Sequence, residues 1–293
     1  MGRTWRLGTR GSLLARTQSG HVADALRAAT GDDVELVIIS TRGDRITDRP
    51  LREVGGKGLF TQELEDGLRD GSLDFAVHSL KDLPSDQPDG LCLGAVPVRA
   101  DARDVLIGGA LADLPMGARV GTGSSRRRLQ LLAARPDLEI CELRGNVDTR
   151  IRRVTDGDLD AVMLAAAGVD RIGRAEVIAE RVDWAVVIPA AAQGALAVQC
   201  RSDDAPTLAL LARVHDPETA EAVDAERAFL AALGGGCSVP AACHVRFDGA
   251  SARILAFHAN DASVWREDVT VPRGEARAVA AALGASRFAR SNR

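Results

Sequence analysis

Short apolar stretches of strand length alternate with helical hydrophobic patterns from the N-terminus onward, and this alternation constrains the fold more than any other feature. Strands are expected at 6–9, 34–40 and 74–79, with helices at 12–29 and 59–70 between them. A chain of this kind predicts a parallel sheet with helices packed on both faces. Ligands bind beyond the carboxyl ends of the strands in such folds, so the residues after each strand are the ones to inspect for function.

Three segments near these strands recur later in the chain, in the same order. The pairs are 6–12 with 119–125, 42–44 with 144–146, and 71–74 with 157–160. We therefore expect two α/β domains of similar, doubly wound topology, which face each other across a cleft. Two chain crossings, at 95–104 and 188–195, are expected to form a hinge between them.

The pattern changes after the second crossing. A helix is expected at 217–233, then three alternating segments and a helix at 275–283. This order is typical of a small α+β domain, here carrying a cysteine loop. We predict a first domain of residues 1–96 and 195–215, a second of 97–194 and a third of 216–293, with the first two similar to the paired domains of periplasmic binding proteins.

The composition excludes several classes of function. The 293 residues are 46% hydrophobic and carry a net charge of −4 with only 3% aromatics, whereas nucleic-acid binders usually combine a basic excess with stacking aromatics. No apolar run is long enough for a bilayer span, no signal-peptide core follows Met1, and the five cysteines lack zinc-site spacing. We expect a cytoplasmic, monomeric protein with reduced thiols, no metal, and no nucleic-acid or membrane partner.

One cysteine, Cys237, follows three consecutive glycines at 234–236. Three glycines leave no side chain to block approach to the sulfur, and they cost conformational entropy on folding. The pattern fits a reactive thiol. It also fits a flexible linker that ends in a buried, inert cysteine, because free cysteine is one of the most buried residue types.

Two predicted helix N-termini combine hydroxyl and cationic side chains. Residues 121–128 place small and hydroxyl residues before three arginines, Arg10 and Ser12 repeat this arrangement in the first domain, and Arg144 and Arg150 follow a later strand. Helix N-termini bind anions through free N–H groups and the macrodipole. A solvated basic helix face is the alternative, but an arginine cleft fits a ligand with several carboxylates, because each guanidinium can hold one of them bidentately.

The chain uses arginine almost everywhere, and its only lysines are Lys57 and Lys81. A retained lysine suggests a site that needs a compact ammonium group. Lys81 stands beside Asp82 after the strand at 74–79, where the carboxylate either forms a surface ion pair or points into the cleft to pair with a cationic intermediate. Glycines flank Lys57 in 55–60, which indicates a mobile loop over a ligand; a phosphate loop is the alternative, but the spacing does not match a Walker motif.

Together these segments resemble porphobilinogen deaminase, a family also called hydroxymethylbilane synthase. The resemblance runs from Leu7 to about Val271 and rests on several motifs in the order in which the family has them. These motifs are 9–12, 54–60, 76–84, 121–127, 143–150 and 236–240.

The resemblance implies a transferase that deaminates four porphobilinogen units, joins them head-to-tail on a covalent dipyrromethane primer, and releases the linear tetrapyrrole hydroxymethylbilane by hydrolysis. It implies a thioether between the dipyrromethane cofactor and Cys237, and a catalytic role for Asp82 with Lys81. The other residues assigned to the cofactor by the resemblance are Lys81, Thr122, Ser124, Arg126, Arg127 and Arg144. Substrate binding is assigned in the same way to Arg10, Ser12, Arg150, Arg171 and Gln193, and the active-site loop to Lys57 and Phe60.

Two departures from the family pattern stand out. Gly123 and Ser125 replace residues that are commonly bulkier, and the chain ends soon after one helix, so we expect a reduced third domain. Two non-enzymatic classes remain alternatives. A solute-binding protein would have an export signal and no role for Cys237, whereas the effector-sensing part of a regulator would come with a helix-turn-helix segment, which is not evident in the sequence.

Overall fold

The computed structural model describes residues 3–41, 43, 61–84, 86–234, 239–260 and 263–291. Their contacts form two compact units. One comprises Met1–Val98 and Leu196–Pro217, and the other Arg99–Ala195 and Glu218–Arg293. The second unit contains most of the second and third domains expected from the sequence, and the three-domain boundaries remain a prediction.

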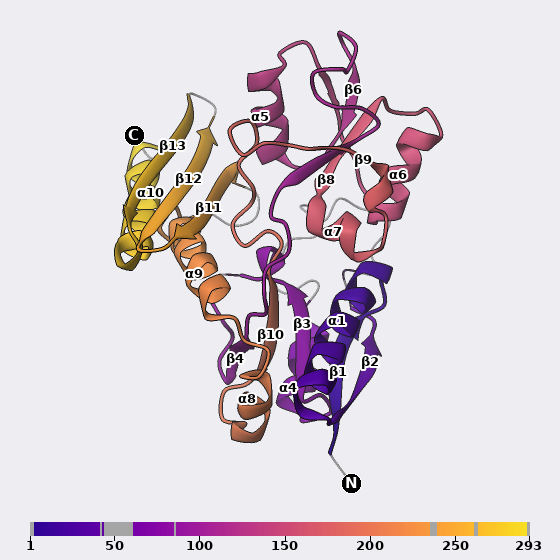
Figure 1. Ribbon diagram of the computed structural model, residues 1–293, viewed down its shortest axis with the longest axis vertical. Coiled ribbons are helices and arrows are strands. Elements are labelled where there is room, and N and C mark those ends of the chain that lie inside the picture. The colour runs from indigo at the N-terminus through magenta and orange to yellow at the C-terminus, as the bar shows by residue number, and fades with distance from the viewer. Residues whose placement is uncertain are drawn as a thin grey trace. The chain divides into compact units, whose positions relative to one another are not determined.

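The first unit is built on a five-stranded sheet with the order β2-β1-β3-β10-β4 (Figure 1). β1 (Thr4–Arg10), β2 (Asp33–Ile39) and β3 (Phe75–Ser79) are parallel. β10 (Leu196–Arg201) runs antiparallel to β3 and to the edge strand β4 (Leu91–Ala95). The sheet is mixed rather than parallel, because β10 comes from the segment that returns to this unit after the second crossing.

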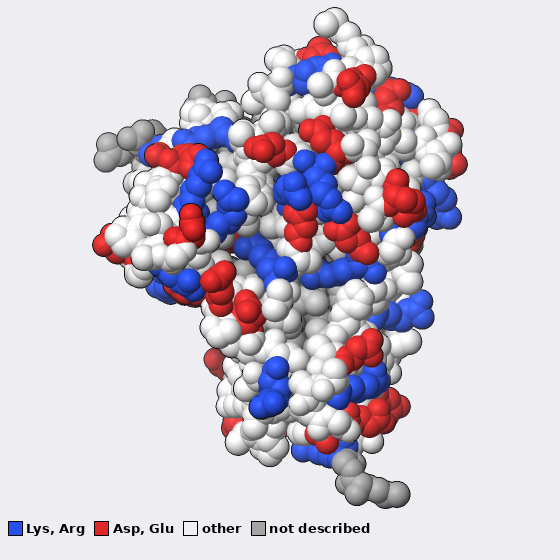
Figure 2. All heavy atoms as spheres, in the orientation of Figure 1, with Lys and Arg blue, Asp and Glu red and all other residues white. Residues whose placement is uncertain are grey.

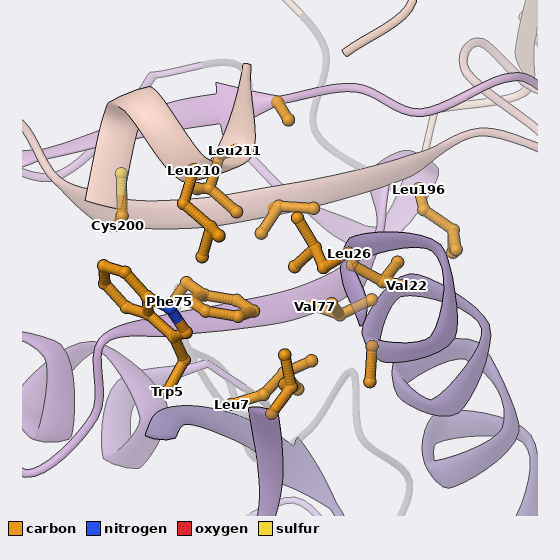
Figure 3. Close-up of a cluster of buried hydrophobic side chains, with 14 residues drawn as sticks. Trp5, Leu7, Val22, Leu26, Phe75, Val77, Leu196, Cys200, Leu210 and Leu211 are labelled. Atoms are coloured by element: carbon orange, nitrogen blue, oxygen red, sulfur yellow. The ribbon is translucent and has the colours of Figure 1, made fainter. Parts of the chain in front are cut away.

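Helices cover both faces of this sheet. α1 (Leu13–Thr30) and α8 (Ala205–Leu211) contribute to the core on one face, and α4 (Gln62–Arg69) to the core on the other. The first core is drawn in Figure 3, which labels Trp5, Leu7, Val22, Leu26, Phe75, Val77, Leu196, Cys200, Leu210 and Leu211. Side chains from β1, β3, β10 and α1 meet there, so apolar burial fixes how the strands and helices of this unit pack.

The second unit repeats this pattern in a sheet with the order β7-β6-β8-β5-β9. β6 (Arg119–Gly121), β7 (Glu139–Cys141) and β8 (Ala161–Ala165) are parallel, and β5 (Asp104–Ile107) runs antiparallel to β8 and β9 (Ile178–Arg181). The helices that cover the faces are α5 (Ser125–Ala134), α6 (Val147–Thr155) and α7 (Ala166–Arg171). The expected pair of similar α/β folds is confirmed.

The last recurrent sequence pair makes the same contacts in both units. The carboxylate of Asp74 accepts the backbone N–H of Arg6 at 2.7 Å, and that of Asp160 accepts the backbone N–H of Arg119 at 2.7 Å. Each aspartate N–H donates back to the carbonyl of the same arginine, at 2.9 and 3.0 Å. These contacts tie the start of β3 to β1 and the start of β8 to β6, which gives the recurrence a structural cause.

The rest of the second unit is a three-stranded antiparallel sheet of β11 (Ala241–Asp248), β12 (Ser251–Asn260) and β13 (Ser263–Pro272). α9 (Pro217–Ala232) and α10 (Ala276–Ser291) share a core with it. The structure also contains short 3₁₀ helices in both units. These are η1 (Leu80–Asp82) in the first unit, and η2 (Ala175–Val177) and η3 (Arg273–Glu275) in the second. The small α+β fold is confirmed.

α10 is longer than the helix expected at 275–283. The expected helix ended at Leu283, but the glycine that follows, Gly284, lies inside α10 and allows a close approach between helices. A Cβ atom at Gly284 would lie 2.2 Å from the carbonyl oxygen of Phe229 in α9. The glycine therefore marks where α10 crosses α9, and the helix continues past it.

Candidate active site

Four predicted site residues lie at one edge of the first unit's sheet. β1 and β3 are parallel neighbours, so their carboxyl ends share this edge. Arg10 ends β1 and Ser12 follows it, while Lys81 and Asp82 belong to η1, directly after β3. Asp82 is exposed and the other three are partly buried. This edge of the sheet thus carries the accessible carboxylate of Asp82 together with two cationic side chains, those of Arg10 and Lys81.

Local hydrogen bonds hold this edge in place. The hydroxyl of Ser12 accepts the backbone N–H of Ala15 at 3.2 Å and caps the N-terminus of α1. One turn further along α1, the amide of Gln18 donates to the hydroxyl of Ser79 at 3.0 Å. The second bond ties α1 to the last residue of β3, so the turn that carries Asp82 starts from a fixed point.

A buried histidine, His78, lies in β3 just before this turn. Burial lowers the pKa of His78 to about 4, a hydrogen bond with Gln199 opposes the shift, and the positive charge of Arg10 adds to it. The imidazole is therefore neutral near pH 7. It adds no positive charge next to Arg10.

The second unit gathers predicted residues at the corresponding edge of its own sheet. β6 is parallel to β7 and β8, so their carboxyl ends also share an edge. Thr122 and Ser124 follow β6, Arg144 follows β7, and Arg171 ends α7 after β8. The hydroxyl of Ser124 accepts the backbone N–H of Arg127 at 3.4 Å and caps α5.

Gly123, one of the departures from the family pattern, lies in the turn between β6 and α5. The backbone N–H of Thr122 donates to the carbonyl of Cys141 at 2.9 Å, which extends the pairing of β6 with β7. A Cβ atom at Gly123 would lie 2.7 Å from the carbonyl oxygen of Leu143. Glycine thus lets the turn pass close to the segment that leads to Arg144.

The structure joins three predicted residues at a carboxylate that the sequence analysis missed, that of Asp104. Oδ2 of Asp104 accepts Nη1 of Arg126 at 2.7 Å. Oδ1 accepts Nε and Nη2 of Arg127 at 3.0 and 2.7 Å, and Nε2 of Gln193 at 2.9 Å. We call these four side chains the Asp104 cluster. The sequence signal for Asp104 was only a carboxylate at the end of a predicted crossing, which any surface aspartate would also give.

The Asp104 cluster holds a buried excess of positive charge. Asp104 is 0% exposed, Arg126 5% and Arg127 6%. Burial by itself would raise the pKa of the Asp104 carboxyl, but the guanidiniums of Arg126 and Arg127 outweigh it and hold that pKa well below its usual range. Two guanidiniums therefore face one carboxylate, and an anionic ligand is the chemistry that would balance them.

The remaining predicted arginines of this unit differ in exposure. The side chain of Arg144 is 47% exposed, with Glu142 3.5 Å away. Arg150 donates from Nε to the carbonyl of Gly145 at 2.7 Å. Arg171 donates from Nη2 to the carbonyl of Gly194 at 2.7 Å, and burial lowers the pKa of its guanidinium to about 10, still charged near pH 7.

Three predicted residues, Cys237, Lys57 and Phe60, lie outside the described residues. The described cysteines are free thiols. Burial raises the pKa of Cys200 to about 12 and that of Cys243 well above its usual range, so neither offers a thiolate near neutral pH.

On the face drawn in Figure 2, basic and acidic side chains are interspersed. Within the described ranges, no group of three or more His, Cys, Asp or Glu is placed to hold a metal ion. None of the described helices has the length and apolarity needed to cross a membrane.

Comparison with known proteins shows which family the chain belongs to. Residues 5–209 match the model of the porphobilinogen deaminase dipyromethane cofactor binding domain, and residues 220–285 match that of the porphobilinogen deaminase C-terminal domain. Porphobilinogen deaminase of Syntrophotalea carbinolica is 47% identical over 291 residues, 97% of this chain and 92% of the relative. That of Brevibacillus brevis is 52% identical over 240 residues, 80% of this chain and 78% of the relative.

Solved structures with a low-scoring similarity to the chain include a periplasmic domain and a binding protein. The VFT2 domain of Bordetella pertussis BvgS has a TM-score of 0.42 and 18% identity, covering 72% of this chain and 86% of that one. The methionine binding protein MetQ has a TM-score of 0.43 and 14% identity, covering 74% and 92%. At these scores and identities the likeness says nothing about function.

Proposed function

The chain belongs to the porphobilinogen deaminase family and is a porphobilinogen deaminase of tetrapyrrole biosynthesis. From this premise we propose which of its residues carry out each part of the reaction. Porphobilinogen is a pyrrole with an acetate, a propionate and an aminomethyl arm. When bound, the dipyrromethane cofactor supplies a covalent primer for the growing chain. Each addition breaks the C–N bond of one aminomethyl arm, releases ammonia, forms a C–C bond and frees a proton, and hydrolysis then releases hydroxymethylbilane after four additions.

The observation that carries this proposal is the position of Asp82 at the edge where β1 and β3 end. Loss of ammonia leaves positive charge on the substrate ring, and a carboxylate hydrogen-bonded to the pyrrole N–H would stabilise it. Asp82 is exposed in η1, and Lys81 and Arg10 lie at the same edge. We assign to Asp82 the stabilisation of this charge and the movement of protons, with Lys81 beside it in η1.

The arginines and hydroxyls bind the carboxylates of the linked pyrroles. We assign Arg10, Ser12, Arg150, Arg171 and Gln193 to the substrate, and Lys81, Thr122, Ser124, Arg126, Arg127 and Arg144 to the cofactor. The growing pyrrole chain gains two carboxylates with every added porphobilinogen unit. Several cations are therefore needed to bind it, although the whole protein has a net charge of −4. Ser124 supports this assignment, because it caps the N-terminus of α5, where backbone N–H groups and the helix dipole favour anions.

The buried positive charge in the second unit suits a cofactor that carries carboxylates. A dipyrromethane carries carboxylates, and the Asp104 cluster holds two buried guanidiniums against one carboxylate. The attachment point is assigned to Cys237. The buried thiols of Cys200 and Cys243 support this assignment by their raised pKa values, because thioether formation needs a thiolate.

The test is an intact-mass measurement on purified protein. We expect the native chain to be heavier than its sequence by two linked pyrrole units, and Cys237→Ala to lose both this excess and hydroxymethylbilane formation. Cys141→Ala, at a partly buried cysteine, is the matched control and should keep both. An active enzyme at the bare sequence mass would contradict covalent attachment.

We further propose that the enzyme acts as a monomer in the cytoplasm on porphobilinogen alone, without nucleic acid or membrane. Charges of both signs are interspersed on the face drawn in Figure 2, which gives no support to an extended basic or acidic docking surface there. Sedimentation equilibrium of the loaded protein should give the mass of one chain.

A further inference from the structure

An acidic residue at an anion site weakens the attraction for the anion, so the presence of Asp104 needs a reason other than charge. Its carboxylate cancels one of the two positive charges that Arg126 and Arg127 bring to the cluster. If only attraction mattered, a neutral residue would serve a carboxylate ligand better. What Asp104 does supply is geometry, because it accepts hydrogen bonds from three side chains at fixed positions.

The two guanidiniums are held in different ways. Arg127 is bound at all three of its nitrogen atoms, since Nε and Nη2 donate to Asp104 and Nη1 donates to the carbonyl of Met163 at 3.1 Å. Arg126 is bound at Nη1, which donates to Asp104 and to the carbonyl of Ile188 at 2.7 Å. In the part of the chain that the structure describes, Nε and Nη2 of Arg126 have no hydrogen-bond partner. These two atoms form the edge of a guanidinium that holds a carboxylate bidentately.

We propose that Asp104 is a positioning residue for cofactor assembly. It fixes Arg126 so that its Nε and Nη2 edge receives a carboxylate of the dipyrromethane, and it holds Arg127 and Gln193 beside it. Immobilising an arginine side chain costs rotamer entropy, and Asp104 imposes that order before the ligand arrives. The inference rests on the proposed function, because it takes the carboxylates of the cofactor as the anion.

The first unit contains a matched carboxylate without a site role. Asp74 is 1% exposed, and its side chain pairs with Arg3 at 2.9 Å and Arg6 at 3.2 Å. The stoichiometry of one carboxylate and two guanidiniums is the same, but the Arg3 and Arg6 side chains are 48% and 42% exposed, so water solvates the excess charge. Asp74→Asn therefore removes a buried carboxylate that pairs with two arginines, as Asp104→Asn does, without touching a predicted ligand-binding residue.

The experiment measures cofactor loading per folded molecule. Asp104→Asn, Asp104→Glu, Asp74→Asn and Arg126→Leu are produced without porphobilinogen, and the folded monomer is separated by gel filtration. Each is incubated with porphobilinogen, and the two-pyrrole mass increase is followed in time, with urea denaturation as the measure of stability. Arg126→Leu sets the scale for loss of the ligand contact itself.

We expect Asp104→Asn to load at least about tenfold more slowly than the native chain, the scale of a misplaced binding group, although it raises the positive charge of the cluster. Asp104→Glu keeps the charge and the ion pairs, so it provides a folded test if the Asn variant does not fold; it should also load slowly, because the added methylene displaces Arg126. Asp74→Asn should be less stable yet load at the native rate.

Two outcomes would overturn the inference. One is native-rate loading of the folded Asp104→Asn or Asp104→Glu proteins, and the other is an equal loading defect in Asp74→Asn, which would make the defect a general effect of stability. A native chain that never gains two pyrrole units would contradict the proposed function instead, so the two failures can be told apart.

Discussion

The carboxylate of Glu226 accepts two hydrogen bonds from the guanidinium of Arg99, at 2.7 and 2.9 Å, with the Glu226 side chain fully buried. Glu226 lies in α9, and Arg99 begins the segment that leads into β5. The same carboxylate accepts the backbone N–H groups of Ala192 at 2.6 Å and Val245 at 2.8 Å. One side chain thus joins α9 and β11 to both crossing segments of the second unit.

Glu226→Gln should lower the free energy of unfolding by about 3 to 5 kcal/mol, the usual result of leaving one member of a buried ion pair unpaired. Urea denaturation measures this change. The control is Asp268→Asn at the exposed Arg253–Asp268 pair, where both side chains are about half exposed and the expected loss is under about 1 kcal/mol. Equal losses in the two variants would show that burial of Glu226 does not matter.

Gly284→Ala should destabilise the packing of α10 on α9, because the new Cβ atom would lie 2.2 Å from the Phe229 carbonyl oxygen. We expect a loss of about 1 to 3 kcal/mol, as for other overpacked positions. Gly20→Ala in α1 is the matched control: a Cβ atom there meets nothing within 4 Å, and the better helix propensity should add about 0.5 to 1 kcal/mol. Thermal unfolding of both variants gives the comparison, and a stabilised Gly284→Ala would show that the helices can separate freely.

His78 should make stability depend on pH in the acid range. Its pKa is about 4 in the folded protein against 6.5 for an ordinary histidine, so the unfolded chain binds the extra proton between these values. Stability is therefore full above about pH 6.5, falls as the pH drops toward 4, and changes no further below it through this group. His78→Gln should show a shallower decrease in urea midpoint across that window. His21→Gln, at an exposed histidine in α1, should keep the native slope, and equal slopes in all three proteins would contradict the burial argument.

Periodicity and recurrence were enough to predict most of the fold. The strand at β1 and the helix at α1 came from local patterns, and the recurrent Gly-x-Leu-Asp segments marked the contacts of Asp74 and Asp160. The antiparallel entry of β10 was not predicted, because strand direction depends on where the chain returns and not on side-chain alternation. The extension of α10 past Gly284 was missed for a similar reason, since a tertiary contact decides the role of that glycine.

The grouping of the candidate residues was predictable wherever they follow a strand, because parallel strands bring their carboxyl ends to one edge. That rule brought Arg10 together with Lys81 and Asp82. It could not find Asp104, which starts an antiparallel strand and is hydrogen-bonded to residues distant in sequence. A single sequence contains no signal for such a pairing.

Asp82→Asn should separate the chemical step from binding. Asn keeps the size and a hydrogen-bond acceptor but removes the negative charge that is proposed to stabilise the substrate cation, so hydroxymethylbilane formation should slow by at least about a hundredfold, the lower range for loss of an acid–base group. The substituted side chain is exposed in η1, so the urea midpoint should change little. Asp82→Glu should retain more activity, because the charge survives.

Asp89→Asn, at another exposed aspartate before β4, is the control for a lost surface charge and should work at the native rate. If Asp82→Asn matched this control in rate, the carboxylate would have no part in the chemistry, and the positive charge on the substrate would have to be stabilised by another group.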